Sequence, residues 1–437
     1  MEHREALLER IRDRRARVGV VGLGYVGLPL AVEFAKAGFR VWGIEVDPER
    51  VRRLRAGESY VQDVESWQIK GLVAEGRLEA TSEFDVLREA DAAIICVPTP
   101  LNPYREPDLS FVVKTTETIA QYLRPGQLIS LESTTYPGTT EEEVLPRFEA
   151  TGLKVGEDYF LVYSPEREDP GNQRYPFYKI PKVVGGVTEG CLRVGEVLYG
   201  TVVERVIPVS SPRVAEMAKL LENIYRAVNI ALVNEMKMLC ERMGMDIWEV
   251  IEVAKSKPFG FQAFYPGPGL GGHCIPIDPF YLTWRARKFD FSTRFIELAG
   301  EINTYMPYYV VERTVEALNR RGKSIQGAKV LLLGVAYKRD VDDVRESPAL
   351  KVMELLLKRG AEVDYNDPHI PALKRMRRYD FRKSSVPINE ETLRCYDCVI
   401  ITTDHSSYDY ELILREAPLI VDTRGVYRGK NDKVVRA

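Results

Sequence analysis

The sequence contains a loop rich in glycine and proline, residues 265–279, with a single cysteine near its centre. The loop reads Tyr-Pro-Gly-Pro-Gly-Leu-Gly-Gly-His-Cys-Ile-Pro-Ile-Asp-Pro, so Asp278 follows Cys274 by four residues. Proline and glycine at this density exclude a helix or a central strand. Glycine lets a backbone approach a ligand closely, proline stiffens a loop, and cysteine can form covalent intermediates. The loop is therefore a candidate active-site loop, and the alternative is a surface turn in which the cysteine only fills space.

A second candidate lies on a long predicted helix, which follows Ser210-Ser211-Pro212 and runs to Met243, before Gly244. Its ends carry the expected residues, a serine cap with proline at the first position and a C-terminal glycine. At 1.5 Å per residue it would be roughly 45 Å long, so we expect it to bridge two domains. Lys219 and Asn223 lie four residues apart and share one face, although a solvated lysine is the ordinary alternative. Apolar residues recur near a 3.6-residue period at Val214, Met217, Ala218, Leu221, Tyr225, Val228, Leu232 and Leu239.

The N-terminal part of the chain has the pattern of a dinucleotide-binding unit. A buried strand, residues 17–21, leads directly into Gly22-Leu23-Gly24-Tyr25-Val26-Gly27, then into a predicted helix (28–37) and a second strand (39–44). Gly22 permits the tight turn, Gly24 lets a pyrophosphate approach the helix N-terminus, and Gly27 lets helix and strand pack. Glu45 ends the second strand, where its carboxylate would accept from a ribose hydroxyl and repel a 2′-phosphate. The pattern therefore predicts NAD rather than NADP.

Three polar loops follow further predicted strands, residues 91–97, 128–131 and 159–163. Thr99, Thr134 and Glu166 fall in these loops. Each alone is more often a cap or turn residue. Because ligands of open α/β sheets bind beyond the carboxyl ends of the strands, the three together favour one shared site.

The C-terminal part returns to an α/β rhythm, with predicted strands at 327–334, 362–365, 397–403 and 419–422 and a helix at 347–359. This region lacks a complete GxGxxG pattern, so we expect it to bind something other than a dinucleotide. Lys338 and Arg345 lie in the loop after its first strand, where they could hold phosphates. A solvated charge cluster is an equally good interpretation of these two side chains.

Composition bounds the class of protein. The chain has 437 residues, 45% hydrophobic and 29% charged, with a formal net charge of −3. Such values are typical of globular proteins of two or three domains and predict no nucleic-acid partner and no anionic membrane partner. The sequence shows no apolar run of membrane-spanning length, and the charged N-terminal stretch is no secretory signal, so we expect a cytoplasmic protein. Six scattered cysteines argue against a disulfide scaffold, and the single CxxC pair, 395–398, lacks a second pair for zinc, so we expect no metal.

With these pieces in place, the chain resembles the UDP-glucose/GDP-mannose dehydrogenase family over essentially its whole length, residues 18–426. The supporting stretches are Gly22-Leu23-Gly24-Tyr25-Val26-Gly27-Leu28-Pro29, Val97-Pro98-Thr99-Pro100, Glu132-Ser133-Thr134, Lys219-Leu220-Leu221-Glu222-Asn223, Gly267-Pro268-Gly269-Leu270-Gly271-Gly272-His273-Cys274 and Gly334-Val335-Ala336-Tyr337-Lys338. Within the family, residues 163–172 and 273–278 look most like the UDP-N-acetylglucosamine 6-dehydrogenase branch.

The resemblance implies an NAD-dependent oxidation of a sugar-nucleotide C6 alcohol to a carboxylate in two steps. Cys274 would add to the aldehyde as a thiolate, and the resulting thioester would be hydrolysed. Lys219, aided by Asn223, would stabilise oxyanions or accept a proton. Asp278, with Thr134, would position a water, and Glu166 would be the base for hydrolysis. The family assigns acid–base work variously among these groups, so their individual roles stay open.

The resemblance also implies three sets of site residues. The catalytic set is Cys274, Lys219, Asn223, Asp278, Glu166 and Thr134. The cofactor set is Gly22, Gly24, Tyr25, Val26, Gly27, Glu45, Arg50, Pro98, Thr99 and Thr134. The substrate set is Glu166, Arg167, Lys219, Asn223, Phe264, Tyr265, Gly267, Gly269, Gly271, Lys338 and Arg345.

Two departures from the broader family bear on the sugar. Ile277 precedes Asp278 where many members have lysine, and residues 258–260 lack an arginine that some UDP-glucose enzymes use. Both count against UDP-glucose, and Arg167 with residues 168–172 could instead serve an N-acetyl group. The expected substrate is UDP-GlcNAc, with UDP-ManNAc, UDP-GalNAc and UDP-glucose as alternatives. A nucleotide-sugar-binding protein without turnover is the non-enzymatic alternative, and a C2-epimerase is disfavoured by the intact glycine fingerprint.

The expected architecture is α/β, with two Rossmann-like domains joined by a central helical domain that contains the long helix. We expect an NAD-binding domain at 1–209, a central domain for dimerisation and the catalytic loop at 210–318, and a UDP-sugar-binding domain at 319–437. The family generally dimerises through its middle helices, so a homodimer or a dimer of dimers is expected. A place in polysaccharide biosynthesis is the corresponding pathway expectation.

Overall fold

The computed structural model describes residues 2–61, 63–102, 104–168, 175–272, 275–376 and 378–437. The chain forms two compact units, residues 1–222 with 280–291 and residues 223–279 with 292–437. The division falls inside the helix α8 (Pro212–Arg242), and each unit is described by itself.

The first unit is built on an eight-stranded sheet with the order β3-β2-β1-β4-β5-β6-β7-β8. Neighbouring strands run parallel except β6 and β7, which pair antiparallel. The order reverses between β1 and β4, which is the switch point where open α/β sheets bind ligands. The strands are β1 (Arg17–Val21), β2 (Arg40–Ile44), β3 (Leu78–Thr81), β4 (Ala92–Ile95), β5 (Leu128–Leu131), β6 (Phe160–Tyr163), β7 (Lys182–Gly186) and β8 (Val206–Val209).

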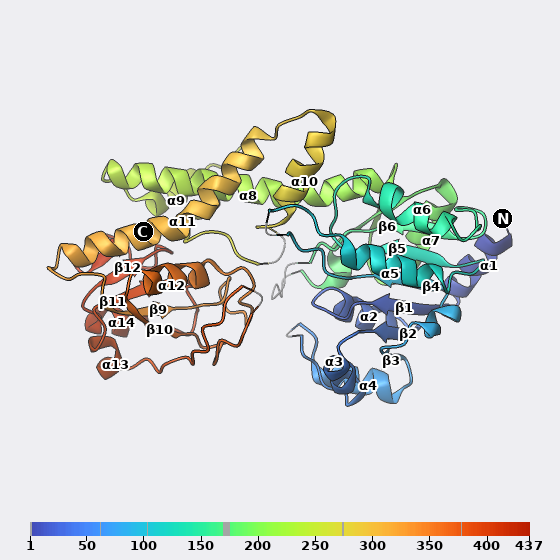
Figure 1. The fold of residues 1–437 in the computed structure, drawn as a ribbon, viewed down its shortest axis with the longest axis horizontal. Helices are drawn as coiled ribbons and strands as arrows, with labels where there is room; N and C mark the ends of the chain where they lie inside the picture. Colours follow the sequence, from blue (N-terminus) through green and yellow to red (C-terminus); the bar gives the residue numbers. More distant parts are fainter. Residues whose placement is uncertain (1, 62, 103, 169–174, 273–274, 377) are drawn as a thin grey trace. The chain divides into compact units, whose positions relative to one another are not determined.

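Helices cover both faces of this sheet, as buried parallel strands require (Figure 1). The helices are α1 (Glu2–Arg12), α2 (Gly27–Lys36), α3 (Pro48–Arg55), α4 (Ser66–Ala74), α5 (Ser110–Ala120), α6 (Leu145–Glu149) and α7 (Glu189–Tyr199). Apolar residues of α1, α2, α4 and α7 pack on one face, and those of α5 and α6 pack on the other. Short 3₁₀ segments lie at Asp85–Arg88 and Phe177–Lys179, and a π-helical turn lies at Thr140–Val144.

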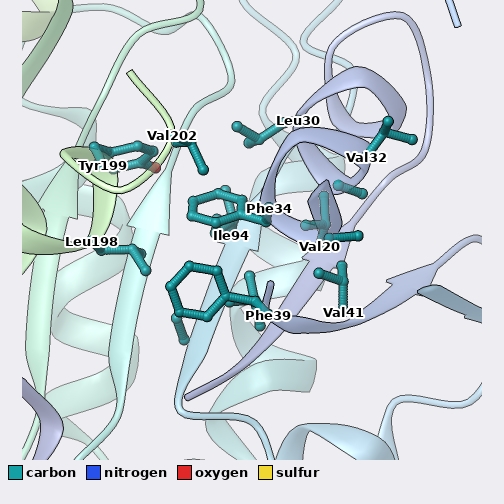
Figure 2. Close-up of a cluster of buried hydrophobic side chains, with 14 of the residues drawn as sticks. Val20, Leu30, Val32, Phe34, Phe39, Val41, Ile94, Leu198, Tyr199 and Val202 are labelled. Carbon is teal, nitrogen blue, oxygen red and sulfur yellow. The ribbon is translucent and has the colours of Figure 1, made fainter. Parts of the chain in front are cut away.

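The core of the first face centres on Phe34 of α2 and Phe39, whose rings meet edge to face with centroids 5.8 Å apart (Figure 2). Val20 and Ile94 of the sheet lie in the same cluster and are fully buried. Burying each such side chain contributes roughly 1.5–3 kcal/mol. This packing fixes α2 against β1, and so fixes the glycine turn that joins them.

The second unit contains a smaller sheet, entirely parallel, with the order β10-β9-β11-β12-β13. Its switch point lies between β9 and β11. The strands are β9 (Lys329–Leu333), β10 (Glu362–Asn366), β11 (Cys398–Ile401), β12 (Ile420–Asp422) and β13 (Val434–Arg436). Helices α11 (Arg294–Asn319) and α12 (Pro348–Lys358) pack on one face, and α13 (Glu390–Arg394) and α14 (Tyr410–Glu416) on the other. The remaining helices are α9 (Ile247–Lys255) and α10 (Asp278–Ala286), and the latter continues into a 3₁₀ turn at Arg287–Phe289.

The predicted α/β architecture with a long central helix is confirmed. The long helix was expected from residue 212 to 243 and is found from 212 to 242. Sequence reasoning identified the strong apolar strands but missed β3, β7, β8 and β13. The three-domain boundaries stay a prediction, since the compact units divide the chain in a different way. Among the helices of the described chain, none is long and apolar enough to cross a membrane.

A buried lysine lies on α8 in the second unit. Lys237 is 3% exposed, and its Nζ has no hydrogen-bond partner among the described residues. The amine lies 5.7 Å from the ring centroids of Trp248 and Tyr309, which attract a cation through their faces. Burial lowers the pKa of Lys237 to about 7, although Glu241 and Asp422 oppose the shift. This lysine therefore costs stability where it is charged.

We expect Lys237→Met to raise the thermal midpoint of this unit near neutral pH. The pKa is about 10.5 in the unfolded chain and about 7 in the folded one, so the unfolded chain binds the extra proton between these values. The cost of Lys237 therefore grows as pH falls from about 10.5 to about 7, by at most about 1.4 kcal/mol per pH unit. Differential scanning fluorimetry at about pH 7 and about pH 9.5 measures this, with Lys358→Met on α12 as the exposed-lysine control. An equal benefit at both pH values would contradict the expectation.

Candidate active site

The glycine turn between β1 and α2 has the geometry that a dinucleotide needs. Gly22 has a φ of +90°, and a Cβ there would lie 2.7 Å from the carbonyl oxygen of Cys96. A Cβ on Gly27 would lie 1.9 Å from the oxygen of Gly22, so only glycine fits. Gly24 faces open space, and α2 has no capping side chain on its N-cap residue, Val26. Uncapped amides beside open space fit a pyrophosphate, so residues at this turn would hold NAD.

Glu45 stands at the end of β2, as expected, and is 5% exposed. Its carboxylate accepts from the backbone N of Leu23 at 3.3 Å and of Asp47 at 3.1 Å. Arg50 Nη1 donates to it at 3.3 Å. Glu45 therefore holds the glycine turn through the backbone N of Leu23. Arg50, which is also in the predicted cofactor set, pairs with the same carboxylate.

The three polar loops follow β4, β5 and β6, which are adjacent parallel strands. The structure thus brings Thr99, Thr134 and Glu166 to one edge of one sheet. Ser133 Oγ donates to the carbonyl of Val97 at 2.7 Å, which ties the second loop to the first. The hydroxyl of Tyr281 on α10 donates to the carbonyl of Thr99 at 2.9 Å. Sequence reasoning missed this tyrosine, although it lies only three residues after Asp278.

Two successive residues of the third loop pair with α8. Lys219 Nζ lies 3.3 Å from Glu166 Oε2, and both side chains are nearly buried. Arg167 donates from Nε and Nη2 to Glu222, at 3.3 and 2.6 Å, and from Nη1 to the carbonyl of Pro181 at 2.7 Å. Lys219 is therefore not a solvated surface lysine. All three guanidinium nitrogens of Arg167 already donate to groups of the protein.

Besides Lys219, the first unit contains a second buried lysine, Lys182, near the Lys219–Glu166 pair. Lys182 of β7 pairs with Glu132 at 2.5 Å, and the hydroxyl of Tyr199 donates to the same carboxylate at 2.6 Å. Burial raises the pKa of Glu132 despite these partners. Burial also raises the pKa of Glu168 well above its usual value, and the neighbouring Glu166 adds to the shift. Glu132 lies in one of the stretches that carry the family resemblance, but Lys182 was not singled out, and their pairing was missed because the two residues are fifty positions apart in the sequence.

In the second unit, Asn223 Nδ2 donates to Asp278 Oδ2 at 2.6 Å. Asn223 is 5% exposed and Asp278 is 2% exposed. Asn223 belongs to α8 and Asp278 is the first residue of α10, so their bond fixes the start of the helix that follows the glycine-rich loop. Cys274 lies outside the described residues, so its predicted role stays a prediction.

Within the second unit, the backbone of the glycine-rich loop packs closely against Asn234, Arg424 and Tyr337. Gly267 N donates to Asn234 Oδ1 at 3.0 Å, and a Cβ on Gly267 would meet the Arg424 guanidinium at 2.7 Å. A Cβ on Gly271 would lie 2.6 Å from the Cβ of Tyr337. A side chain at Gly271 would therefore displace the loop, whereas one at Gly267 would displace the guanidinium of Arg424.

The next glycines continue this close fit. Gly269 has a φ of +133°, and Gly272 a φ of +83°. Gly272 N donates to the carbonyl of Arg345 at 3.0 Å, two residues before the predicted nucleophile. The loop is thus a shaped, close-packed segment and no ordinary surface turn.

The remaining predicted substrate residues lie around this loop and the loop after β9. Tyr265 donates its hydroxyl to Glu252 of α9 at 2.8 Å, while Phe264 packs edge to face on Tyr225. The guanidinium of Arg345 makes a bidentate pair with Asp343, with a closest contact of 2.6 Å. Lys338 and Arg345 both lie at the carboxyl edge of the second sheet, as expected.

Comparisons with known proteins match this architecture part by part. The NAD-binding domain of the UDP-glucose/GDP-mannose dehydrogenase family matches residues 16–203, its central domain matches 213–305, and its UDP-binding domain matches 331–429. A UDP-N-acetyl-D-glucosamine 6-dehydrogenase of Pseudomonas aeruginosa is 36% identical over 394 residues, covering 90% of this chain and 91% of that protein. A UDP-N-acetyl-D-mannosamine dehydrogenase of Pyrococcus horikoshii is 33% identical over 432 residues, covering 94% and 99%.

Solved structures agree with the sequence relatives. The structure of a UDP-D-ManNAc dehydrogenase from Pyrococcus horikoshii has a TM-score of 0.87 at 32% identity, covering 96% of this chain and 98% of that one. A UDP-glucose dehydrogenase from Pyrobaculum islandicum has a TM-score of 0.83 at 29% identity, covering 96% of each chain. The resemblance first drawn from the glycine turn, the strand-end loops and the cysteine loop is confirmed: the chain belongs to the UDP-glucose/GDP-mannose dehydrogenase family and is an NAD-dependent UDP-sugar dehydrogenase.

Proposed function

We propose that this enzyme oxidises the C6 hydroxyl of UDP-N-acetylglucosamine to the uronic acid. The reaction converts one alcohol, one water and two NAD⁺ into one carboxylate, two NADH and three protons. NAD⁺ supplies the hydride acceptor in both oxidations. Two relatives, 36% and 35% identical, are named UDP-N-acetyl-D-glucosamine 6-dehydrogenase, which supports this sugar over its C2 epimer.

The observation that carries the chemistry is the set of two buried pairs made by α8. Lys219 pairs with Glu166, and Asn223 pairs with Asp278. A lysine held in a site of low polarity stabilises an oxyanion more strongly than it would in water. In our proposal Lys219 and Asn223 bind the developing oxyanion at C6.

The second oxidation requires covalent capture. The thiolate of Cys274 adds to the C6 aldehyde to form a thiohemiacetal, whose oxidation leaves a thioester. Water then attacks the thioester carbonyl and Cys274 leaves as the thiolate. Glu166 accepts the proton of that water, and Asp278 with Thr134 orients it.

Sugar preference is the direct test of the substrate. NADH formation near 340 nm should show the highest kcat/KM with UDP-GlcNAc in a panel that also contains UDP-ManNAc, UDP-GalNAc and UDP-glucose. With the sugar limiting, we expect two NADH for each sugar consumed. A higher kcat/KM for UDP-ManNAc would reassign the C2 configuration, and one NADH per sugar would exclude the four-electron reaction.

Replacement of the nucleophile tests the covalent step. Cys274→Ala should lower steady-state NADH formation by at least about 10³-fold, because no thioester can form. Cys395→Ala, at an exposed cysteine, is the matched control and should behave as the wild type. Near-normal NADH yield from Cys274→Ala would remove this residue from the mechanism.

A homodimer built on α8 is the oligomeric state we propose. Six residues of the stripe predicted from the sequence are exposed along the helix, namely Val214, Met217, Leu221, Tyr225, Leu232 and Leu239, while Ala218 and Val228 are partly buried. Leu232 is 56% exposed and Leu221 is 63% exposed. An apolar stripe of this length on a surface helix is typical of a face that another copy covers.

Leu232→Asp should therefore convert the protein to a monomer in size-exclusion chromatography with light scattering. A charge at the centre of an apolar interface remains desolvated without a partner, and this costs several kcal/mol. Leu357→Asp on α12, where the leucine is 36% exposed, is the control that should leave the mass unchanged. A wild-type protein that is monomeric at micromolar concentration would refute the proposal.

A further inference from the structure

Asp367, the first residue after β10, is a carboxylate saturated with hydrogen bonds. Its Oδ2 accepts from the backbone N of Val335 at 2.7 Å and of Ala336 at 2.9 Å. Its Oδ1 accepts from the backbone N of His369 at 2.8 Å and of Ile370 at 3.1 Å. Although burial alone would raise the pKa of Asp367, these bonds and His405 hold it below its usual value. The side chain is therefore an ionised clamp between the loops after β9 and β10.

His405, which follows β11, also binds this carboxylate and links it to a third loop. Its Nε2 lies 3.1 Å from Asp367 Oδ2, and its Nδ1 lies 3.0 Å from the backbone N of Asp340. A backbone N–H can only donate, so Nδ1 must carry the lone pair and Nε2 the hydrogen. Both side chains, Asp367 and His405, have no exposed surface. The pair therefore has no route to a substrate and cannot act as a catalytic acid or base.

The same assignment excludes a metal at this cluster. Asp340, His369 and His405 have ligand atoms within 4.8 Å of one another, which at first suggests a cation site. A metal needs a lone pair from each imidazole. The lone pair of His405 Nδ1 accepts from Asp340 N–H, and its Nε2–H donates to Asp367. His405 therefore has no lone pair left for a metal, and only Asp340 and His369 of this cluster remain as possible ligands.

Between the two anchors lies the segment 335–340, which contains Lys338. Its first anchor is reinforced, since Thr403 Oγ1 donates to the carbonyl of Ala336 at 2.6 Å. Asp340 has a φ of +58°, a left-handed conformation that is costly for a residue with a side chain. Its carboxylate accepts from Ser406 N at 2.9 Å, which offsets part of that cost. The segment is thus held in one conformation that it would not adopt unaided.

The position of segment 335–340 suggests why a fixed conformation matters there. It follows β9, and His405 follows β11, so the two flank the switch point of the second sheet. Ligands of such sheets bind beyond the carboxyl ends of the strands at this point. A loop ordered before binding loses less entropy when the ligand arrives, and so binds it more tightly.

We propose that Asp367 and His405 are positioning residues that hold segment 335–340 in its UDP-binding conformation. They set the affinity for the nucleotide and leave the chemistry at C6 unchanged. The inference rests on the proposed function, because it takes the second sheet's switch point as the UDP site.

The test is the affinity for UDP alone, measured by isothermal titration calorimetry on the full-length protein. His405→Phe keeps an aromatic ring but leaves Asp340 N–H without its acceptor and Asp367 with one donor fewer. We expect the Kd for UDP, and the KM for the UDP-sugar, to rise about tenfold. The kcat at saturation and the KM for NAD⁺ should stay within about twofold of wild type.

Asp367→Asn should weaken UDP binding further than His405→Phe does. An asparagine of the same shape turns an NH₂ group toward backbone N–H donors in either orientation, so one side of the clamp opens. Leu393→Ala, in the apolar core on the opposite face of the sheet, is the destabilised control. It should lower the thermal midpoint without changing the Kd for UDP.

The outcomes separate this inference from the proposed function. If His405→Phe binds UDP as tightly as wild type, or if Leu393→Ala loses the same affinity at a matched thermal midpoint, the inference is overturned. If wild type binds UDP but forms no NADH with any UDP-sugar, the proposed function fails, and the UDP affinities still decide the inference. A wild-type protein that does not bind UDP would overturn both.

Discussion

Buried carboxylates that accept backbone amide hydrogens hold the functional loops of this enzyme in place. Glu45 braces the glycine turn after β1, and Asp367 clamps the loop after β9. Glu216 of α8 accepts from the backbone N of Gly138 at 2.6 Å and of Thr140 at 2.9 Å. Because a buried carboxyl oxygen needs hydrogen-bond donors to replace water, each of these side chains determines the path of the backbone around it. Loops that would otherwise sample many conformations are fixed by a few buried acidic side chains.

Close packing is the second constraint, and it explains why the cysteine loop is rich in glycine. Where Gly271 lies against Tyr337, no Cβ fits, and a Cβ on Gly267 would displace the guanidinium of Arg424. The loop therefore packs through its backbone at these positions rather than through side chains. Asn234 and Asn223 of α8, which bond to Gly267 N and to Asp278, fix the loop before and after Cys274.

Local patterns in the sequence predicted a large part of this structure. The glycine turn, the long helix, the polar strand ends and the family all follow from residues close together in the chain, where period and turn chemistry act directly. What could not be predicted joins distant residues, such as Lys182 with Glu132 and Asp367 with His405. No periodicity marks such pairs, since each partner alone resembles an ordinary surface charge. The solvated interpretation of Lys219 was wrong for this reason: its partner Glu166 lies 53 residues earlier.

The charges beside Lys219 form one buried cluster in which acidic groups outnumber basic ones. Three carboxyl groups, Glu132, Glu166 and Glu168, accompany two lysines, Lys182 and Lys219. Full ionisation would leave an unbalanced negative charge in a buried place, which is costly. Burial raises the pKa of Glu168 well above its usual value, and the nearby Glu166 adds to the shift, so protonation of this carboxyl is the change that would relieve the imbalance. With that proton in place, the two remaining carboxylates match the two lysines, and the cluster has no net charge.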